Sequence, residues 1–143
     1  MLRYIALLLL AACLVAGCAS TISGPVVALP NGYYLRPDKK QQTEIVKRGG
    51  RQVLRGPIAA YAVSGAIAAG AQGEPRAESR SYPNDLPFKG TSETRYFVLD
   101  TMSGRLDTDL DESAWRSRLA EVGAPSTMRI YAPLPWQIAK RRE

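Results

Sequence analysis

The side chains that could do chemistry in this 143-residue chain are few in type, because it has two cysteines and no histidine. Both cysteines, Cys13 and Cys18, lie in the apolar stretch AACLVAGCAS near the N-terminus. Without histidine the chain has neither the Ser-His-Asp nor the Cys-His arrangement of nucleophilic catalysis. It also lacks the ordinary ligands of a zinc site, so neither a metal nor a cofactor is expected.

Carboxylates are the remaining candidates, and they concentrate in the segment DTDLDE. Asp107, Asp109 and Asp111 have the spacing of the first, third and fifth ligands of an EF-hand loop. Glu112 stands where that loop needs glycine, and Arg118 stands where it needs a bidentate glutamate. An EF-hand is therefore excluded. The carboxylates fit the start of a helix, whose dipole favours negative charge, and a looser calcium site is the alternative.

Hydrolysis of a wall glycan is the one catalytic chemistry that these carboxylates could serve. It needs two carboxyl groups about 5 to 9 Å apart across the sugar. Asp100 with Glu112 or Asp109 could supply such a pair, but so could almost any acidic segment. A carboxylate-based glycosidase is therefore the weakest functional hypothesis, and a role other than catalysis is expected.

The N-terminal residues have the composition of a secretory signal peptide. Arg3 supplies a short positive region, and the stretch from Tyr4 to Gly17 is apolar and uncharged. This length suits the apolar region of a signal peptide and is short for a membrane span, which takes about 20 residues. Residues 1–17 are therefore predicted to be removed on export.

The sequence VAGC, which ends at Cys18, resembles the lipobox of bacterial lipoproteins, in which small residues precede a lipid-modified cysteine. LAAC, which ends at Cys13, also fits the pattern, but cleavage there would leave an apolar region of only about eight or nine residues. Cys18 is therefore the favoured lipidation site and Cys13 the alternative. The resemblance implies cleavage by the type II signal peptidase and addition of three acyl chains to the new N-terminal cysteine.

Three acyl chains make a stable membrane anchor, because each buried methylene contributes about 0.8 kcal/mol and one chain alone holds only marginally. In enterobacterial lipoproteins an aspartate after the modified cysteine marks retention in the inner membrane, and this chain has Ala19 there. The resemblance thus implies a lipid-anchored protein of the cell envelope, at the outer membrane and facing the periplasm. Because Cys13 leaves with the signal peptide, the mature chain has no disulfide.

Charge is unevenly distributed within the formal net charge of +6. Residues 36–55 hold seven basic and two acidic side chains, a net +5, whereas residues 100–112 hold one arginine and five acidic side chains, a net −4. An exported basic patch is expected to contact an anionic lipid or wall component rather than nucleic acid. Lys47, Arg48 and Arg51 are the candidate contacts. The alternative is a solvated strand pair whose basic side chains protect a sheet edge.

Two segments lack the pattern of regular structure. Residues 18–30 are small, uncharged and punctuated by Ser, Gly and Pro, as in a flexible tether. Residues 73–93 are crowded with Pro, Gly, Ser and charge, and ordinary connections span only about four to six residues. This long loop is either a flexible excursion or a binding loop. Tyr82 and Phe88 are the side chains that it could present to a partner.

Residues 31–143 are predicted to form one α+β domain, a small antiparallel sheet of about five short strands with one helix of the C-terminal half packed on it. The expected strands include 33–35, 44–48, 51–55, 94–100 and 126–132, with a glycine hairpin joining the second to the third. Residues 57–72 are ambiguous, because their alanines favour a helix whereas Ser64-Gly65 and the branched side chains favour two short strands. Two strands are preferred.

The helix is predicted to follow Asp111, which can cap its first amides, and to end at the sequence GAP that begins at Gly123. Trp115, Leu119 and Val122 share one face of this helix and should close the core over the sheet. Residues 133–143 are predicted to be an extended basic tail.

Three functional hypotheses follow. The first is a membrane-anchored periplasmic lipoprotein with a non-catalytic binding or structural role, which contacts an envelope protein or an anionic wall or lipid component. The second is a lipoprotein inhibitor or immunity protein that neutralises a periplasmic toxin or hydrolase. The third is the carboxylate glycosidase.

Lipidation predicts the intact mass of the mature protein, which should begin at Cys18 and carry three acyl chains. Globomycin, which blocks the type II signal peptidase, should leave the uncleaved precursor, and Cys18→Ser should remove the acyl mass. A Cys18→Ser protein that is exported and still fractionates with membranes, from a parent without acyl mass, would contradict the prediction.

Overall fold

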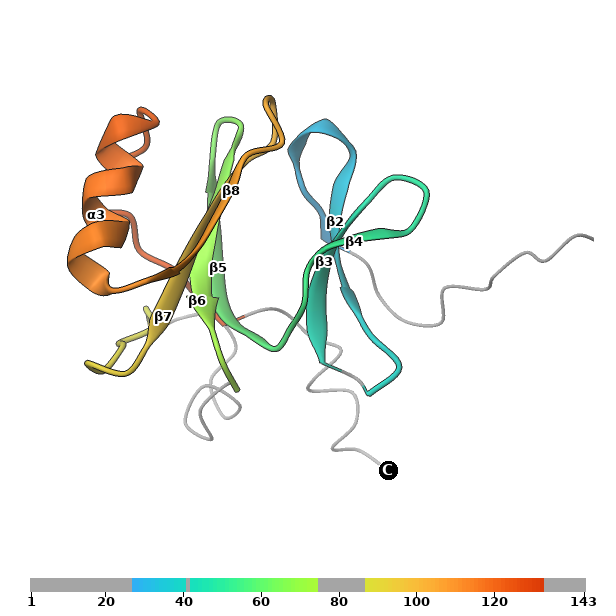
Figure 1. Cartoon of the computed structure of the whole chain (residues 1–143), viewed down its shortest axis with the longest axis horizontal. Helices are drawn as coiled ribbons and strands as arrows, with labels where there is room; N and C mark the ends of the chain where they lie inside the picture. The colour runs from blue at the N-terminus through green and yellow to red at the C-terminus, as the bar shows by residue number, and fades with distance from the viewer. Residues whose placement is uncertain (1–26, 41, 75–86, 133–143) are drawn as a thin grey trace, which may run out of the picture.

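The computed structural model describes residues 27–40, 42–74 and 87–132. Two four-stranded antiparallel sheets stack face to face, and a helix covers the outer face of the second sheet (Figure 1). The protein is therefore α+β with a helix in its C-terminal half, as predicted. The single sheet of about five strands is wrong, because the structure has two sheets that share a core.

The first sheet, named sheet A, has the strand order β1-β2-β3-β4. Its strands are β1 (Val27–Ala28), β2 (Tyr33–Pro37), β3 (Thr43–Lys47) and β4 (Arg51–Leu54), and the 3-10 helix η1 (Pro30–Gly32) joins β1 to β2. Gly49 and Gly50 connect β3 to β4 with φ angles of 92° and 84°, which side chains other than glycine rarely adopt. The predicted glycine hairpin is confirmed.

The folded chain begins earlier than the predicted boundary at residue 31. Val27 and Ala28 pair with β2, with Val27 opposite Leu35, and Leu29 is buried in the core between the sheets. Burial of the Leu29 side chain lowers the free energy of the folded state, and it holds the end of the predicted tether as an edge of the sheet. The predicted lipobox, with Cys13 and Cys18, lies outside the described residues.

The second sheet, named sheet B, has the strand order β5-β6-β7-β8. Its strands are β5 (Ile58–Ser64), β6 (Ile67–Gln72), β7 (Arg95–Asp100) and β8 (Leu106–Leu110). β5 and β6 form an antiparallel pair that turns at Gly65, where φ is 56°. The ambiguous segment is therefore two strands, as preferred. β7 lies between β6 and β8, which confirms the central position that its apolar sequence predicts.

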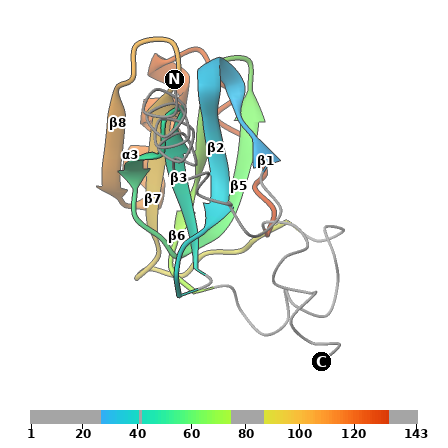
Figure 2. The same cartoon turned by 90° about the vertical axis from the view of Figure 1, so that its right-hand side faces the viewer.

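Sheet B is buried on both faces, and this explains its composition. Ile58, Phe97 and Leu99 face sheet A, whereas Tyr96 and Val98 face the helix. A strand that is covered on both faces reads as a continuous apolar run, as in YFVL of β7. Figure 2 looks onto sheet A and shows its strands roughly aligned with those of sheet B behind them.

The strand β8 is not among the predicted strands, because its sequence LDTDL carries two aspartates. In the structure Leu106 lies opposite Leu99 and Asp107 opposite Val98, and the register shifts farther along. Asp109 in this region has a φ of 55°. β8 tolerates the aspartates because an edge strand has one side open to solvent.

The helix α3 (Glu112–Glu121) begins as predicted. The Asp111 carboxylate accepts a hydrogen bond of 2.8 Å from the Ala114 amide. Trp115 and Leu119 are buried against sheet B. The Trp115 ring stacks on Tyr96 with 4.6 Å between ring centroids, and its indole N–H donates to the Phe97 carbonyl at 3.1 Å. No helix within the described ranges is long and apolar enough to cross a membrane.

The predicted strand at 126–132 is wrong, since this segment makes only an isolated bridge in which Tyr131 pairs with Tyr61. The reason lies in its carbonyl groups. Arg116 from α3 donates to the carbonyls of Ser126 and Met128, and these bonds hold the segment against the helix, not along a neighbouring strand. Residues 75–86 of the predicted long loop and the predicted tail at 133–143 lie outside the described residues.

Gly70 of β6 provides a stability test, because a Cβ there would lie 2.1 Å from the Ala60 carbonyl oxygen and 2.9 Å from the Phe97 ring. We expect Gly70→Ala to lower the free energy of unfolding by about 3 kcal/mol, the upper part of the range for overpacked cores. Urea titration followed by circular dichroism measures this change.

Gly65→Ala is the matched control, because Gly65 has a positive φ but no atom within 4 Å of the added Cβ. Its cost should be about 1 kcal/mol, the penalty of the left-handed conformation. Equal losses in the two variants would contradict close packing at Gly70.

Candidate functional site

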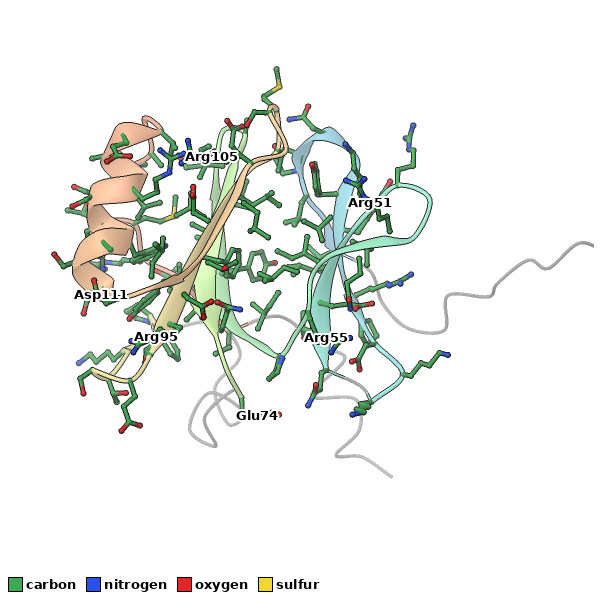
Figure 3. The ribbon with its side chains drawn as sticks, in the orientation of Figure 1. Arg51, Arg55, Glu74, Arg95, Arg105 and Asp111 are labelled. Atoms are coloured by element: carbon green, nitrogen blue, oxygen red, sulfur yellow. The ribbon has the colours of Figure 1, made fainter. Side chains whose placement is uncertain are left out.

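The predicted contact residues lie at two separate places. Lys47, Arg48 and Arg51 surround the β3–β4 turn of sheet A, where Lys47 lies opposite both Tyr33 and Arg51 in the register; Arg51 is labelled in Figure 3. Phe88 packs against the core cluster around Trp115, on the α3 side of sheet B. Tyr82 lies outside the described residues. The structure therefore separates the basic candidates from the one aromatic candidate that it describes.

A groove of about 320 Å³ opens between α3 and the segments 87–90 and 128–130, and we name it the α3 groove. Its floor is buried and apolar, made by Tyr96, Trp115, Met128 and Ile130. Its rim is charged, made by Lys89, Glu112, Arg116 and Arg129. Three basic side chains against one acidic side chain give the rim a positive balance that suits an anionic partner.

Arg116 fixes one wall of the α3 groove. Its guanidinium carbon lies 4.6 Å from the Trp115 ring centroid, a cation–π contact. The same group donates to the carbonyls of Ser126 at 2.7 Å and Met128 at 2.9 Å. It also lies 3.6 Å from the Glu112 carboxylate. Arg116 thus joins the helix to the segment after it, and the wall exists before any partner arrives.

Phe88 fixes the other wall. Its amide donates to the Ile130 carbonyl at 2.8 Å, and its half-buried ring packs against the cluster that contains Trp115. Phe88 therefore anchors the C-terminal end of the predicted long loop. The adjacent Lys89 is exposed at the rim.

Lys89, Arg116 and Arg129 are groove residues that sequence reasoning missed. They are far apart along the chain and follow no common period, and nothing in their spacing indicates that α3 and the end of the loop meet. A preference of Arg116 for the neighbouring Trp115 ring is the one local signal, and it is weak.

The aspartates of the acidic segment DTDLDE have different structural roles. Asp107 accepts from Arg118 Nε at 2.7 Å and lies 3.3 Å from Arg105. Asp111 caps α3, and Asp109 is exposed. Within the described ranges no three histidine, cysteine or acidic side chains gather to hold a metal ion. The looser calcium site therefore finds no ligand set there.

Asp100 is held in the β7–β8 turn. Its carboxylate accepts from the Ser103 hydroxyl at 2.8 Å and from the Met102 and Ser103 amides. These bonds, the Ser103 hydroxyl first, hold the pKa of Asp100 below its usual value. Asp100 lies near the start of β8, whereas Glu112 follows its end. The five residues of β8 span about 17 Å, and Asp109 lies near the end of this strand. The two candidate pairs are thus spread along β8, and the glycosidase hypothesis stays a prediction.

The second candidate place is a depression of about 390 Å³ on the outer face of sheet A, which we name the basic depression. It is lined by Tyr34, Arg36, Val46, Lys47, Arg48, Gly49 and Gly50. Its floor is largely apolar and its charged rim is entirely basic. Beside it, buried Glu44 accepts from Arg36 Nε at 3.0 Å and from the Gln52 amide.

The Asp107–Arg118 pair predicts a pH dependence of stability. Partial burial tends to raise the pKa of Asp107, but the hydrogen bond and charge of Arg118, with Arg105, outweigh it and lower the pKa. The ionised carboxylate therefore stabilises the fold above its unfolded-state pKa of about 3.9, and this contribution is lost as pH falls through the lower native pKa.

Asp107→Asn should lower the midpoint of thermal unfolding by a few degrees at pH 7, and the difference from the parent should shrink below about pH 3. Differential scanning calorimetry from pH 2 to pH 7 measures both. Asp109→Asn is the control and should change little, because the exposed Asp109 has no ion pair among the described residues. A loss for Asp107→Asn that is constant over this range would refute the electrostatic origin.

Comparison of the chain with protein-family models, with curated proteins and with solved structures finds no match.

Proposed function

We propose that this protein is a periplasmic lipoprotein, anchored at the outer membrane through Cys18, that binds an envelope partner in the α3 groove without catalysing a reaction. The anchor is supported by the VAGC sequence that ends at Cys18. It is also consistent with the eight small or apolar residues that lie between Cys18 and Val27, the first residue that the structure describes.

The α3 groove carries the binding proposal because both of its walls are fixed within the free protein. Arg116 holds the segment 126–130 against α3, and the Phe88–Ile130 hydrogen bond holds the end of the loop. A preformed site loses less conformational entropy on binding than one that must order itself. Its volume of about 320 Å³ is within the range of ligand pockets.

The charges of the rim indicate the chemistry of the partner. Lys89 and Arg129 are exposed, and Arg116 retains partial exposure beside them. Glu112 is the one acidic side chain of the rim. We infer that the groove takes an acidic segment of an envelope protein, whose carboxylates meet these cations and whose apolar side chains reach the floor at Met128 and Ile130.

Site-specific photocrosslinking in the living cell tests this function. A benzophenone amino acid at Lys89 or Arg129 should capture the same envelope protein, because both positions are exposed at the rim. The same amino acid at Met102, which is 75% exposed on the β7–β8 turn, is the control and should not capture it. Mass spectrometry identifies the captured protein and the crosslinked peptide.

Charge reversal adds a second measurement. Lys89→Glu with Arg129→Glu should reduce capture at a Glu112 crosslinker at least tenfold, while the thermal midpoint stays within a few degrees, because both changed side chains are exposed. Capture that is equal at groove and control positions would refute the assignment of the groove. Capture of a toxin or hydrolase whose activity falls on binding would make the protein an inhibitor.

A further inference from the structure

The guanidinium of Arg116 uses only part of its hydrogen-bonding capacity within the fold. An arginine side chain carries five N–H donors in a fixed plane. In Arg116 the donors on Nη1 serve the carbonyls of Ser126 at 2.7 Å and Met128 at 2.9 Å. The donors on Nε and Nη2 have no hydrogen-bond acceptor in the described part of the chain. Nε and Nη2 lie on one edge of the guanidinium, so a whole edge of Arg116 is available to a ligand.

Glu112 is the one carboxylate near this edge among the described residues. Its Oε1 lies 3.6 Å from Arg116 Nη2, which is longer than a hydrogen bond between these groups. The two side chains are 63% and 37% exposed, so water weakens their attraction. By contrast, Arg118 of the same helix bonds to Asp107 at 2.7 Å and to Glu121 at 2.9 Å. Arg116 is therefore only loosely paired.

The available edge is held in position at the α3 groove. The groove opens at the first turns of α3, which follow Asp111 in Figure 3. Arg116 and Glu112 both line it. The Trp115 ring and the bonds made by Nη1 fix the plane of the guanidinium. An edge with two parallel N–H groups matches the two oxygens of a carboxylate, and such paired bonds are among the stronger hydrogen bonds of proteins.

The neighbouring cations contribute charge without this directionality. Lys89 and Arg129 are exposed at the rim, and neither has a carboxylate within 4.0 Å in the described segments. Exposed charges of this kind mainly raise the rate of encounter with an acidic partner. A half-buried guanidinium that is already oriented can fix the position of one carboxylate.

We propose that the Nε–Nη2 edge of Arg116 binds a carboxylate of the partner, which displaces Glu112 from its loose contact. This proposal rests on the binding role of the α3 groove in the proposed function, and it names the group that an aspartate or glutamate of the partner meets there. Displacement leaves the wall of the groove intact, because Nη1 keeps its bonds to Ser126 and Met128. Glu112 is therefore a built-in competitor that weakens binding.

Removal of the competing charge tests the proposal in the cell. Glu112→Gln should raise capture by a benzophenone amino acid at Lys89 by about fivefold, because a like charge about 5 Å from the incoming carboxylate no longer opposes it. Glu121→Gln is the matched control. Glu121 also lies on α3 and beside an arginine, its side chain is 64% exposed, and it does not line the groove. This control should leave capture unchanged.

A measurement on the purified protein identifies the atom that binds. The Nε–H signals of the ¹⁵N-labelled protein are followed by NMR during titration with acetyl-Leu-Glu-amide or with acetyl-Leu-Gln-amide, two peptides that differ only in the carboxylate. The glutamate peptide should shift the Arg116 signal, with about fivefold tighter binding to Glu112→Gln than to the parent. The glutamine peptide should not shift it. The Arg118 signal should stay constant, because its Nε already donates to Asp107.

Each failure has its own signature. Absence of capture at both Lys89 and Arg129 overturns the proposed function, and this inference with it. Capture at Lys89 that Glu112→Gln leaves unchanged or lowers, or that Glu121→Gln raises equally, overturns the role of Glu112 and leaves the groove as a binding site. Equal shifts of the Arg116 signal by the two peptides, or no shift by either, would show that its free edge does not bind the carboxylate.

Discussion

The contact between Trp115 and β7 is the interaction on which the rest of the structure depends. Trp115 is the largest fully buried side chain of the described residues, and it fills the space between α3 and sheet B. Its ring stacks on Tyr96, and its indole N–H reaches the Phe97 carbonyl, so a polar group is buried without losing its hydrogen bond. This contact holds α3 against one face of sheet B, and sheet A packs against the other face.

The same contact organises the candidate binding groove. Arg116 follows Trp115 in the helix and lies over its ring, which places the guanidinium where it can hold the carbonyls of Ser126 and Met128. That segment in turn offers the Ile130 carbonyl to Phe88. The groove therefore has walls from three segments, and their common support is a tryptophan buried in the core.

The two-sheet arrangement also explains why the basic residues and the acidic segment of the protein lie apart. The basic residues belong to sheet A, whereas most residues of the acidic segment belong to β8 and the start of α3. The core between the sheets separates them, so attraction between them is weak, and Asp107, Asp111 and Glu112 are paired or used locally instead.

Local sequence determined the features that depend on neighbouring residues. Gly49-Gly50 specifies a tight hairpin because both positions need a positive φ, and Asp111 begins α3 because its carboxylate caps a nearby amide. The apolar run of β7 predicts a buried strand in the same way. Only the tertiary structure decided that there are two sheets, that LDTDL becomes an edge strand, and that residues 126–132 serve Arg116 instead of a ladder. These outcomes depend on which faces are covered by segments distant in sequence, and no local pattern of residues carries that information.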